Sequence, residues 1–220
     1  MLRMEWFIRE YASKIKKKNV KVLDVGSYDV NGSYSVLFDK YEYVGLDIVK
    51  GKNVDIVIPS PYDWSSIKSD HYDIVISGQA FEHIEFFWIT IEQMARVLKR
   101  NGLMCIIVPN GAGEHRYPVD CYRFFTDGMI ALARYVNLEV LHAHTNCSPN
   151  RKQKDWVSRN NADSMLVATK KYDGSPVLIN KNYGCIPANQ EELRIGFTPY
   201  KRRIPLRRIL RKMLLLNLKR

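Results

Sequence analysis

Short apolar stretches alternate with helix-spaced apolar patterns along most of the chain. The apolar stretches lie at 20–25, 43–47, 53–58, 72–77, 103–108, 138–144 and 164–169. Most are near-continuous runs of valine, leucine and isoleucine, which is the composition of strands buried on both faces of a parallel sheet. Apolar residues spaced three and four apart predict helices at 4–17, 88–99 and 126–135. The pattern therefore predicts an α/β fold built on one sheet.

Local signals set several boundaries. Asn101-Gly102 predicts a left-handed end for the helix at 88–99. Thr126-Asp127 predicts a polar cap at the start of the following helix. A turn signal at Asn31-Gly32 precedes a short helix predicted at 33–38.

The first apolar stretch is the centre of the predicted binding site. It is interrupted by Asp24 and followed at once by Gly26, while the second stretch ends in Asp47. Ligands of open α/β sheets bind outside the carboxyl ends of the strands. An acid about twenty residues after the first glycine suits a pair of ribose hydroxyls. We therefore expect a nucleotide-containing ligand here.

Both NAD and S-adenosylmethionine contain a ribose that would fit this pattern. The sequence of the loop after the first strand distinguishes between them. Residues 26–31 read Gly-Ser-Tyr-Asp-Val-Asn, which lacks the Gly-x-Gly-x-x-Gly spacing that places a pyrophosphate on a helix start. The carboxylate of Asp24 would repel a pyrophosphate and attract the ammonium group of a methionine moiety. The sequence therefore favours S-adenosylmethionine over NAD.

Four segments carry a resemblance to a known family: VLDVGS (22–27), VGLDI (44–48), YDIVISGQAFEHI (72–84) and ARVLKRNG (95–102). In this order and spacing they resemble the class I S-adenosylmethionine-dependent methyltransferases. The resemblance covers about residues 20–110 and implies a Rossmann-like, doubly wound sheet that is mostly parallel, with an antiparallel last strand at 164–169. Tyr28 to Val30 depart from the small residues usual after the first glycine.

The resemblance also implies roles for single residues. The expected cofactor-binding residues are Asp24, Gly26, Ser27, Asp47, Ile48, Gln79 and Ala80. Gln79 and Ala80 would line the cofactor through backbone groups, in a turn beside the reacting methyl. In relatives, the Glu82-His83 pair mostly fixes this loop and caps the following helix, although His83 is also a candidate for contact with the acceptor.

The loop at 110–126 concentrates polar and aromatic residues after the fifth strand, where it can fold over the methyl donor as a lid. His115, Pro118, Asp120, Tyr122 and Arg123 resemble the His-x-x-Pro-x-Asp-x-(aromatic)-Arg segment of methyltransferases encoded in bacterial surface-polysaccharide clusters. The resemblance implies a sugar or related glycan acceptor. The expected acceptor-binding residues are His83, Arg116, Tyr117, Tyr122 and Arg123. The alternative is that Asp120 and Arg123 form a salt bridge that holds the lid.

A sugar hydroxyl is a poor nucleophile while protonated, so a base is expected. His115 is the first candidate because an imidazole titrates near neutral pH. Asp120 is the second, either as the base or as the group that orients the imidazole. Arg116 or Arg123 could hold an acceptor phosphate through paired hydrogen bonds. A divalent metal is an alternative for which His115, Asp120 and Glu82 could supply ligands, but their spacing does not establish a site, and no metal-binding residue is assigned.

Composition and charge bound the remaining possibilities. The 220 residues carry a net charge of +11, and nine of the basic residues and no acid lie in 201–220. The rest of the chain is nearly neutral, which argues against a nucleic-acid partner. The four cysteines lie far apart without a Cys-x-x-Cys pair, which predicts neither zinc nor a disulfide framework. A reduced, cytoplasmic setting is expected.

Two parts of the chain are expected. Residues 1–172 would form the methyltransferase domain, and 173–220 a C-terminal extension. The apolar positions of 204–218 lie on one helical face with arginines and lysines elsewhere, which favours binding to a membrane surface. A protein partner or self-association is the next alternative, and nucleic acid the last.

The predicted function is O-methylation of a sugar, nucleotide-sugar or related group in bacterial capsule or lipopolysaccharide biosynthesis. One alternative is a methyltransferase for a small metabolite or RNA. Another is a catalytically silent scaffold that binds S-adenosylmethionine and recruits partners through its tail.

Overall fold

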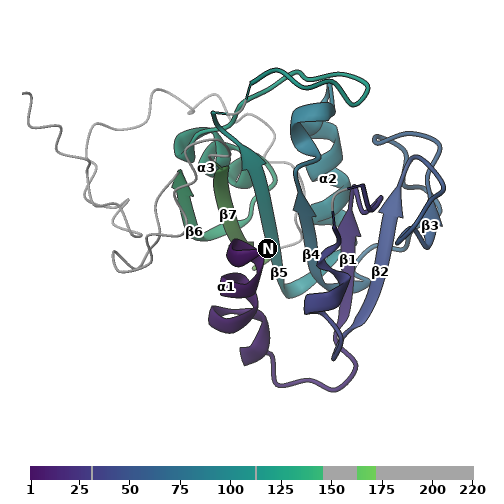
Figure 1. The fold of residues 1–220 in the computed structure, drawn as a ribbon. Helices are drawn as coiled ribbons and strands as arrows, with labels where there is room; N and C mark the ends of the chain where they lie inside the picture. The colour runs from purple at the N-terminus through teal and green to yellow at the C-terminus, as the bar shows by residue number, and fades with distance from the viewer. Residues whose placement is uncertain (31, 112, 146–162, 172–220) are drawn as a thin grey trace, which may run out of the picture. The chain divides into compact units, whose positions relative to one another are not determined.

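The computed structural model describes residues 1–30, 32–111, 113–145 and 163–171. Figure 1 shows a sheet with helices packed on it. The strands are β1 (Lys21–Val25), β2 (Glu42–Asp47), β3 (Ile56–Val57), β4 (Tyr72–Gly78), β5 (Leu98–Pro109), β6 (Glu139–Thr145) and β7 (Asp163–Thr169). The helices are α1 (Leu2–Glu10), α2 (Phe87–Val97) and α3 (Thr126–Tyr135), with single 3₁₀ turns η1 (Ala12–Lys14), η2 (Tyr34–Leu37) and η3 (Phe81–His83).

The seven strands form one sheet in the order β3-β2-β1-β4-β5-β7-β6. Neighbouring strands from β3 to β5 are parallel. β7 runs antiparallel to both of its neighbours, β5 and β6. The order reverses between β1 and β4, which is the switch point where open α/β sheets bind ligands. The predicted doubly wound sheet with an antiparallel last strand is confirmed.

Each face of the sheet has its own apolar core. Alternate residues of β5 divide between them: Met104 and Ile106 pack with α2 and α3, whereas Cys105 and Ile107 pack with α1 and η2. Because side chains alternate across a strand, a continuously apolar strand serves both layers at once. The helices of the two layers leave the carboxyl ends of β1, β2 and β4 at one edge, at the top of Figure 1, with the segment after β5 looping over it.

Several predicted boundaries differ from the structure. The helix predicted at 4–17 ends at Glu10, and the third strand is reduced to Ile56–Val57. Asn101 does adopt a left-handed φ of 61°, but it lies inside β5, because α2 ends at Val97. The buried Lys170 ammonium accounts for this earlier end, since it donates to the carbonyls of Ala95 and Leu98.

The predicted cap at Thr126 is also wrong. Phe125 is the residue before α3, and no side chain caps this end. The Thr126 hydroxyl instead lies 2.8 Å from the Thr145 hydroxyl of β6, and the Thr126 amide donates to that same oxygen. The threonine therefore joins α3 to the sheet.

Several predictions fall on residues outside the described part. These are the extension at 173–220 and its basic segment 201–220. Within the described residues, no helix combines the length and the apolar character needed to cross a membrane.

Candidate active site

The loop after β1 lies close against the loop after β4 at the carboxyl edge of the sheet. Gly26 has a φ of 78°, and a Cβ atom built on it would lie 2.5 Å from the Cβ of Ala80 in the loop after β4. The Gly26 and Ser27 amides both donate to the Leu46 carbonyl of β2. Glycine is required here because a side chain would close the gap between the two loops. The arrangement fits the expectation that a cofactor lies against the backbone at this position.

Asp47 lies at the end of β2, as predicted, and its carboxylate organises the loops around it. One oxygen accepts hydrogen bonds from the amides of Ile48 and Val49, and the other accepts from the amide of Tyr28. The Ile48 side chain beside it is 45 % exposed. A carboxylate flanked by an exposed apolar side chain suits a ribose diol and the adenine attached to it.

Asp24 is less accessible than the sequence suggested. It is buried within β1, and its carboxylate accepts a hydrogen bond from the Tyr43 hydroxyl. Burial raises the pKa of Asp24 to about 7, and the charge of Asp47 adds to the rise. The Ser27 hydroxyl donates to the Asn53 carbonyl, so this side chain fixes the loop. The cofactor contacts assigned to Asp24 and Ser27 stay predictions.

The turn after β4 is held in an unusual conformation. Gln79 has a φ of 56°, and its amide donates to the Ile107 carbonyl of β5. Its side chain donates to Asp163, which also pairs with Arg3 of α1 at 2.5 Å. Ala80 follows, facing Gly26. The structure thus places Gln79 and Ala80 at the predicted edge, with the backbone fixed by β5.

Glu82 in η3 is a buried carboxylate without a partner. Its side chain is 0 % exposed, and neither carboxylate oxygen accepts a hydrogen bond from another described residue. Burial raises the pKa of Glu82 to about 7. The expectation that the Glu82-His83 pair caps the following helix is wrong, because α2 begins after Phe86 without a side-chain cap.

Three contacts bind the predicted lid to the turn at η3. The Cys121 amide donates to the Glu82 carbonyl at 2.7 Å, and the Tyr122 hydroxyl donates to the Glu85 carbonyl at 2.8 Å. The His83 Nδ1 lies 2.6 Å from the Val119 carbonyl. Tyr122 and His83 therefore both fasten the lid, and the acceptor contacts predicted for them are untested.

An ion pair within the lid fixes its shape. Arg123 donates to the two carboxylate oxygens of Asp120 at 2.5 and 2.6 Å, and also to the Gly113 carbonyl. Asp120 accepts a further bond from the His115 amide. The Arg123 guanidinium holds the pKa of Asp120 well below its usual range. This geometry favours the salt-bridge alternative over an acceptor-binding role for Arg123, and makes Asp120 a weak base that orients His115.

His115, Arg116 and Tyr117 form the accessible part of the lid. The His115 side chain is 49 % exposed, and its Nε2 lies 4.0 Å from Oε1 of Glu82. Arg116 pairs with Glu114 at 2.8 Å while 74 % exposed, and Tyr117 is 60 % exposed. These side chains are free to meet an acceptor that approaches the carboxyl edge.

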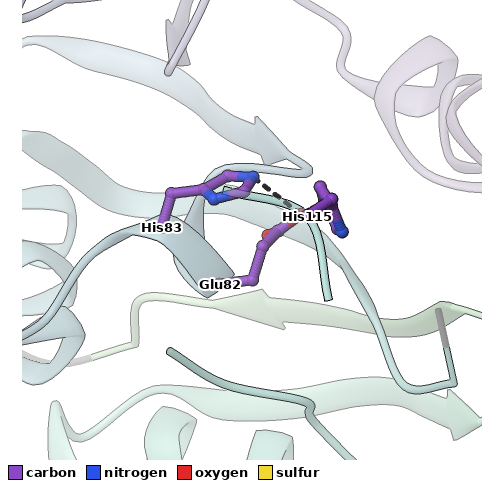
Figure 2. Close-up of side chains that lie close together, drawn as sticks. All are labelled: Glu82, His83 and His115. Atoms are coloured by element: carbon purple, nitrogen blue, oxygen red, sulfur yellow. Dashed lines mark ion pairs between the residues drawn. The ribbon is translucent and has the colours of Figure 1, made fainter. Parts of the chain in front are cut away.

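Sequence reasoning named Glu82 and His115 as possible metal ligands together with Asp120, but it did not include His83. Glu82, His83 and His115 lie together, with one ligand atom from each within 4.8 Å of the others (Figure 2). The signal was present, because an acid and a histidine end the turn after β4 and a third such residue begins the lid. The sequence could not show that the lid folds back onto this turn.

Comparisons with known proteins agree on the class of domain. Residues 23–106 match a family described as "Methyltransferase domain". No curated protein matches the sequence at a significant level. Several solved structures share the fold at low sequence identity.

Three of these structures illustrate the range of proteins that share the fold. A candidate sarcosine dimethylglycine methyltransferase from Galdieria sulphuraria has 19% identity and a TM-score of 0.56, over 78% of this chain and 86% of that one. A SAM-dependent methyltransferase from Archaeoglobus fulgidus has 15% identity and a TM-score of 0.56, over 77% and 94%. The 1,6-didemethyltoxoflavin-N1-methyltransferase of Burkholderia thailandensis, solved with S-adenosylhomocysteine, has 12% identity and a TM-score of 0.57, over 77% of each chain.

Strand order, carboxyl-edge geometry and family match together define a methyltransferase domain of the class I, Rossmann-like fold. The chain is an S-adenosylmethionine-dependent methyltransferase, as the sequence predicted.

Proposed function

We propose that this methyltransferase acts on a hydroxyl group of a sugar, carried by a nucleotide sugar or a related precursor of a bacterial surface polysaccharide. The observation that carries the proposal is the fastening of the lid to the turn at η3, through the Cys121–Glu82 and Tyr122–Glu85 hydrogen bonds. This fastening holds His115 beside Glu82 in the turn at η3, which directly follows Ala80.

The accessible side chains suit an acceptor of this chemistry. Arg116 offers an exposed cation for a phosphate group. Tyr117 on the lid, and Phe86 and Trp88 at the start of α2, present exposed aromatic rings on which the apolar face of a sugar can pack. Ligand sites commonly combine aromatic surface with a few placed polar groups.

The residues of the site would then position the two reactants. S-adenosylmethionine, when bound, supplies an electrophilic methyl group on its sulfonium. A bond forms between the acceptor oxygen and the methyl carbon while the carbon–sulfur bond breaks, which leaves a methyl ether and S-adenosylhomocysteine. The hydroxyl proton would leave at the cluster of Glu82, His83 and His115. Holding the oxygen in line with the methyl group at about 3 Å supplies much of the rate enhancement.

The test is methyl transfer from labelled S-adenosylmethionine to a panel of nucleotide sugars, with RNA and small amines as competing acceptors. We expect a labelled ether on at least one nucleotide sugar. We also expect Arg116→Ala to raise its KM about tenfold or more, while Arg134→Ala, an exposed arginine on α3, leaves it unchanged. Labelling of amines or RNA alone would favour the metabolite or RNA alternative. Binding of S-adenosylmethionine without transfer to any acceptor would favour the silent scaffold.

A further inference from the structure

We propose that Glu82, His83 and His115 form a binding site for one divalent transition-metal ion, with zinc as the first candidate. Within the described residues, this is the one group of three histidine, cysteine or acidic side chains whose ligand atoms converge in this way. Figure 2 shows the two imidazole rings and the carboxylate turned toward one another. The ligands come from two separate segments, the turn after β4 and the lid.

The first observation is the state of the Glu82 carboxylate. It is completely buried, yet neither oxygen has a hydrogen-bond partner among the described residues. A buried ionised carboxylate is costly unless it is paired or coordinates a metal. Such an unpartnered group in an otherwise well-bonded core needs an explanation.

The second observation is the orientation of both histidines. Nδ1 of His83 lies 2.6 Å from the Val119 carbonyl, and Nδ1 of His115 lies 3.1 Å from the Gly113 carbonyl. A carbonyl only accepts, so in a neutral ring Nδ1 carries the hydrogen and Nε2 keeps its lone pair. Metal-binding histidines commonly donate their second nitrogen to a carbonyl in this way. Both free lone pairs then belong to the nitrogens nearest to Glu82.

The third observation is the spacing within the cluster. Oε1 of Glu82 lies 3.7 Å from Nε2 of His83 and 4.0 Å from Nε2 of His115. These separations are too long for direct hydrogen bonds, so the three groups do not satisfy one another. Ligands about 2.0–2.1 Å from a tetrahedral ion lie roughly 3.4 Å apart. The two distances from Glu82 exceed this spacing by only a few tenths of an ångström, and the half-exposed His115 ring can move toward the other two ligands.

Two histidines and one carboxylate leave at least one coordination position open. This ligand set occurs in catalytic zinc sites, where the open position holds water or substrate. An ion here would bind the acceptor hydroxyl and favour loss of its proton, since a metal lowers the pKa of a bound hydroxyl group. His115 would then act as an ion ligand in place of the predicted base. This catalytic role rests on the proposed function, whereas the binding site itself does not.

Binding is tested first, without any acceptor. Untagged protein is stripped with a chelator, dialysed, and titrated with Zn²⁺ by calorimetry, and then with Co²⁺, whose visible absorption reports the coordination geometry. We expect one equivalent to bind per chain, with a Co²⁺ spectrum typical of four- or five-coordinate nitrogen and oxygen ligands. Absence of a stoichiometric site in the folded wild-type protein would overturn the proposal.

Variants then locate the site. Glu82→Gln, His83→Gln and His115→Gln should each weaken Zn²⁺ binding at least tenfold. Glu114→Gln removes the same charge from the same lid, and His71→Gln removes a histidine outside the cluster, so both should bind as the wild type does. Thermal melts establish that each variant is folded, and His115→Gln is the safest because that side chain is half exposed. Unchanged affinity in folded His115→Gln would contradict the assignment.

Activity separates this proposal from the preceding one. If Zn²⁺ binds the cluster but no sugar is methylated, the site stands and the proposed function fails. If the stripped enzyme methylates a nucleotide sugar at the full rate and metal addition changes nothing, the function stands and the catalytic role of the ion fails. Restoration of sugar methylation by Zn²⁺ or Mn²⁺ in stripped wild type, and its absence in His115→Gln, would support both.

Discussion

At the scale of single residues, two buried carboxylates of the site differ from the partly buried Asp47. Asp24 and Glu82 lie in the interior, and burial raises the pKa of each to about 7. Asp47 lies at the edge and is surrounded by three backbone amides. The burial that raises the pKa of Asp24 and Glu82 lowers the stability of the fold when these groups are ionised. Asp47, at the edge of the sheet, is available to a ligand.

Asp47 should determine the affinity for the methyl donor. Asp47→Ala removes the carboxylate expected to bind the ribose diol and the acceptor for the Tyr28 amide, so the Kd for S-adenosylmethionine should rise tenfold or more. Calorimetry with the cofactor measures this, with Asp39→Ala, which removes an exposed carboxylate before the start of β2, as the control. Equal affinities in the two variants would count against the ribose role.

Asp24 should make the stability of the protein depend on pH. Its pKa of about 7 in the folded state lies above that of an unfolded aspartate, near 3.8. Between these values the unfolded chain loses the proton while the folded chain keeps it, so stability falls as the pH rises from about 4 to about 7. Each unit of difference corresponds to about 1.4 kcal/mol.

The matched variant is Asp24→Asn, which cannot ionise. Urea unfolding at pH 4, 5.5 and 7 should show the free energy of unfolding of the wild type declining relative to Asp24→Asn, by a few kcal/mol in all. Asp39→Asn, on the surface, should follow the wild type. Parallel profiles for wild type and Asp24→Asn would mean that the pKa of Asp24 is the same in the folded and unfolded states.

At the scale of elements, the site is formed where the lid packs against the turn at η3 and is held there by hydrogen bonds. The near-continuous apolar runs predicted β1, β4 and β5 well, because a strand buried on both faces has little choice of residue. Asn101 misled the prediction because its left-handed conformation serves a bend inside β5 as well as it would serve a helix end. The local pattern could not reveal that Lys170 ends α2, because Lys170 lies 75 residues after Ala95 and 72 after Leu98, whose carbonyls it binds.

The candidate site was only partly predictable, because contacts between residues far apart in the sequence do not appear in the local pattern. Asp47 and Gly26 follow strands directly, so their place at the carboxyl edge follows from the strand assignment. The convergence of Glu82 with His115 depends on how a 33-residue interval folds back, and on hydrogen bonds such as Cys121 to Glu82 that no sequence pattern encodes. The sequence named the residues of the lid, and the tertiary fold determined which of them face the turn.

The ion pair in the lid should control its order. Arg123→Lys keeps the charge but loses the paired hydrogen bonds to Asp120 and the bond to the Gly113 carbonyl. We expect trypsin to cleave after Arg116 several-fold faster in this variant, with the Kd for S-adenosylmethionine unchanged. Arg134→Lys on α3 is the control and should leave that cleavage rate unchanged. Slower or equal cleavage in Arg123→Lys would show that the ion pair does not restrain the lid.

At the scale of the whole molecule, the charge is divided unevenly. The segment 201–220 contains nine of the basic residues and no acid, and it lies outside the described part of the structure. The residues predicted to bind the methyl donor, from Asp24 to Ala80, all lie in the sheet and the loops at its carboxyl edge. Donor binding and any association of the tail with a surface should therefore be separable by truncation.

A chain ending at residue 200 tests this separation. It should bind S-adenosylmethionine with the affinity of the full chain, because the sheet and its loops are intact. Sedimentation with vesicles that contain anionic lipid should recover the full chain but not the truncated one, since clustered basic residues contribute about 1 kcal/mol each near such a surface. Vesicles of neutral lipid should recover neither. A full chain that stays in solution with anionic vesicles, but forms dimers that the truncated chain does not, would assign the tail to self-association.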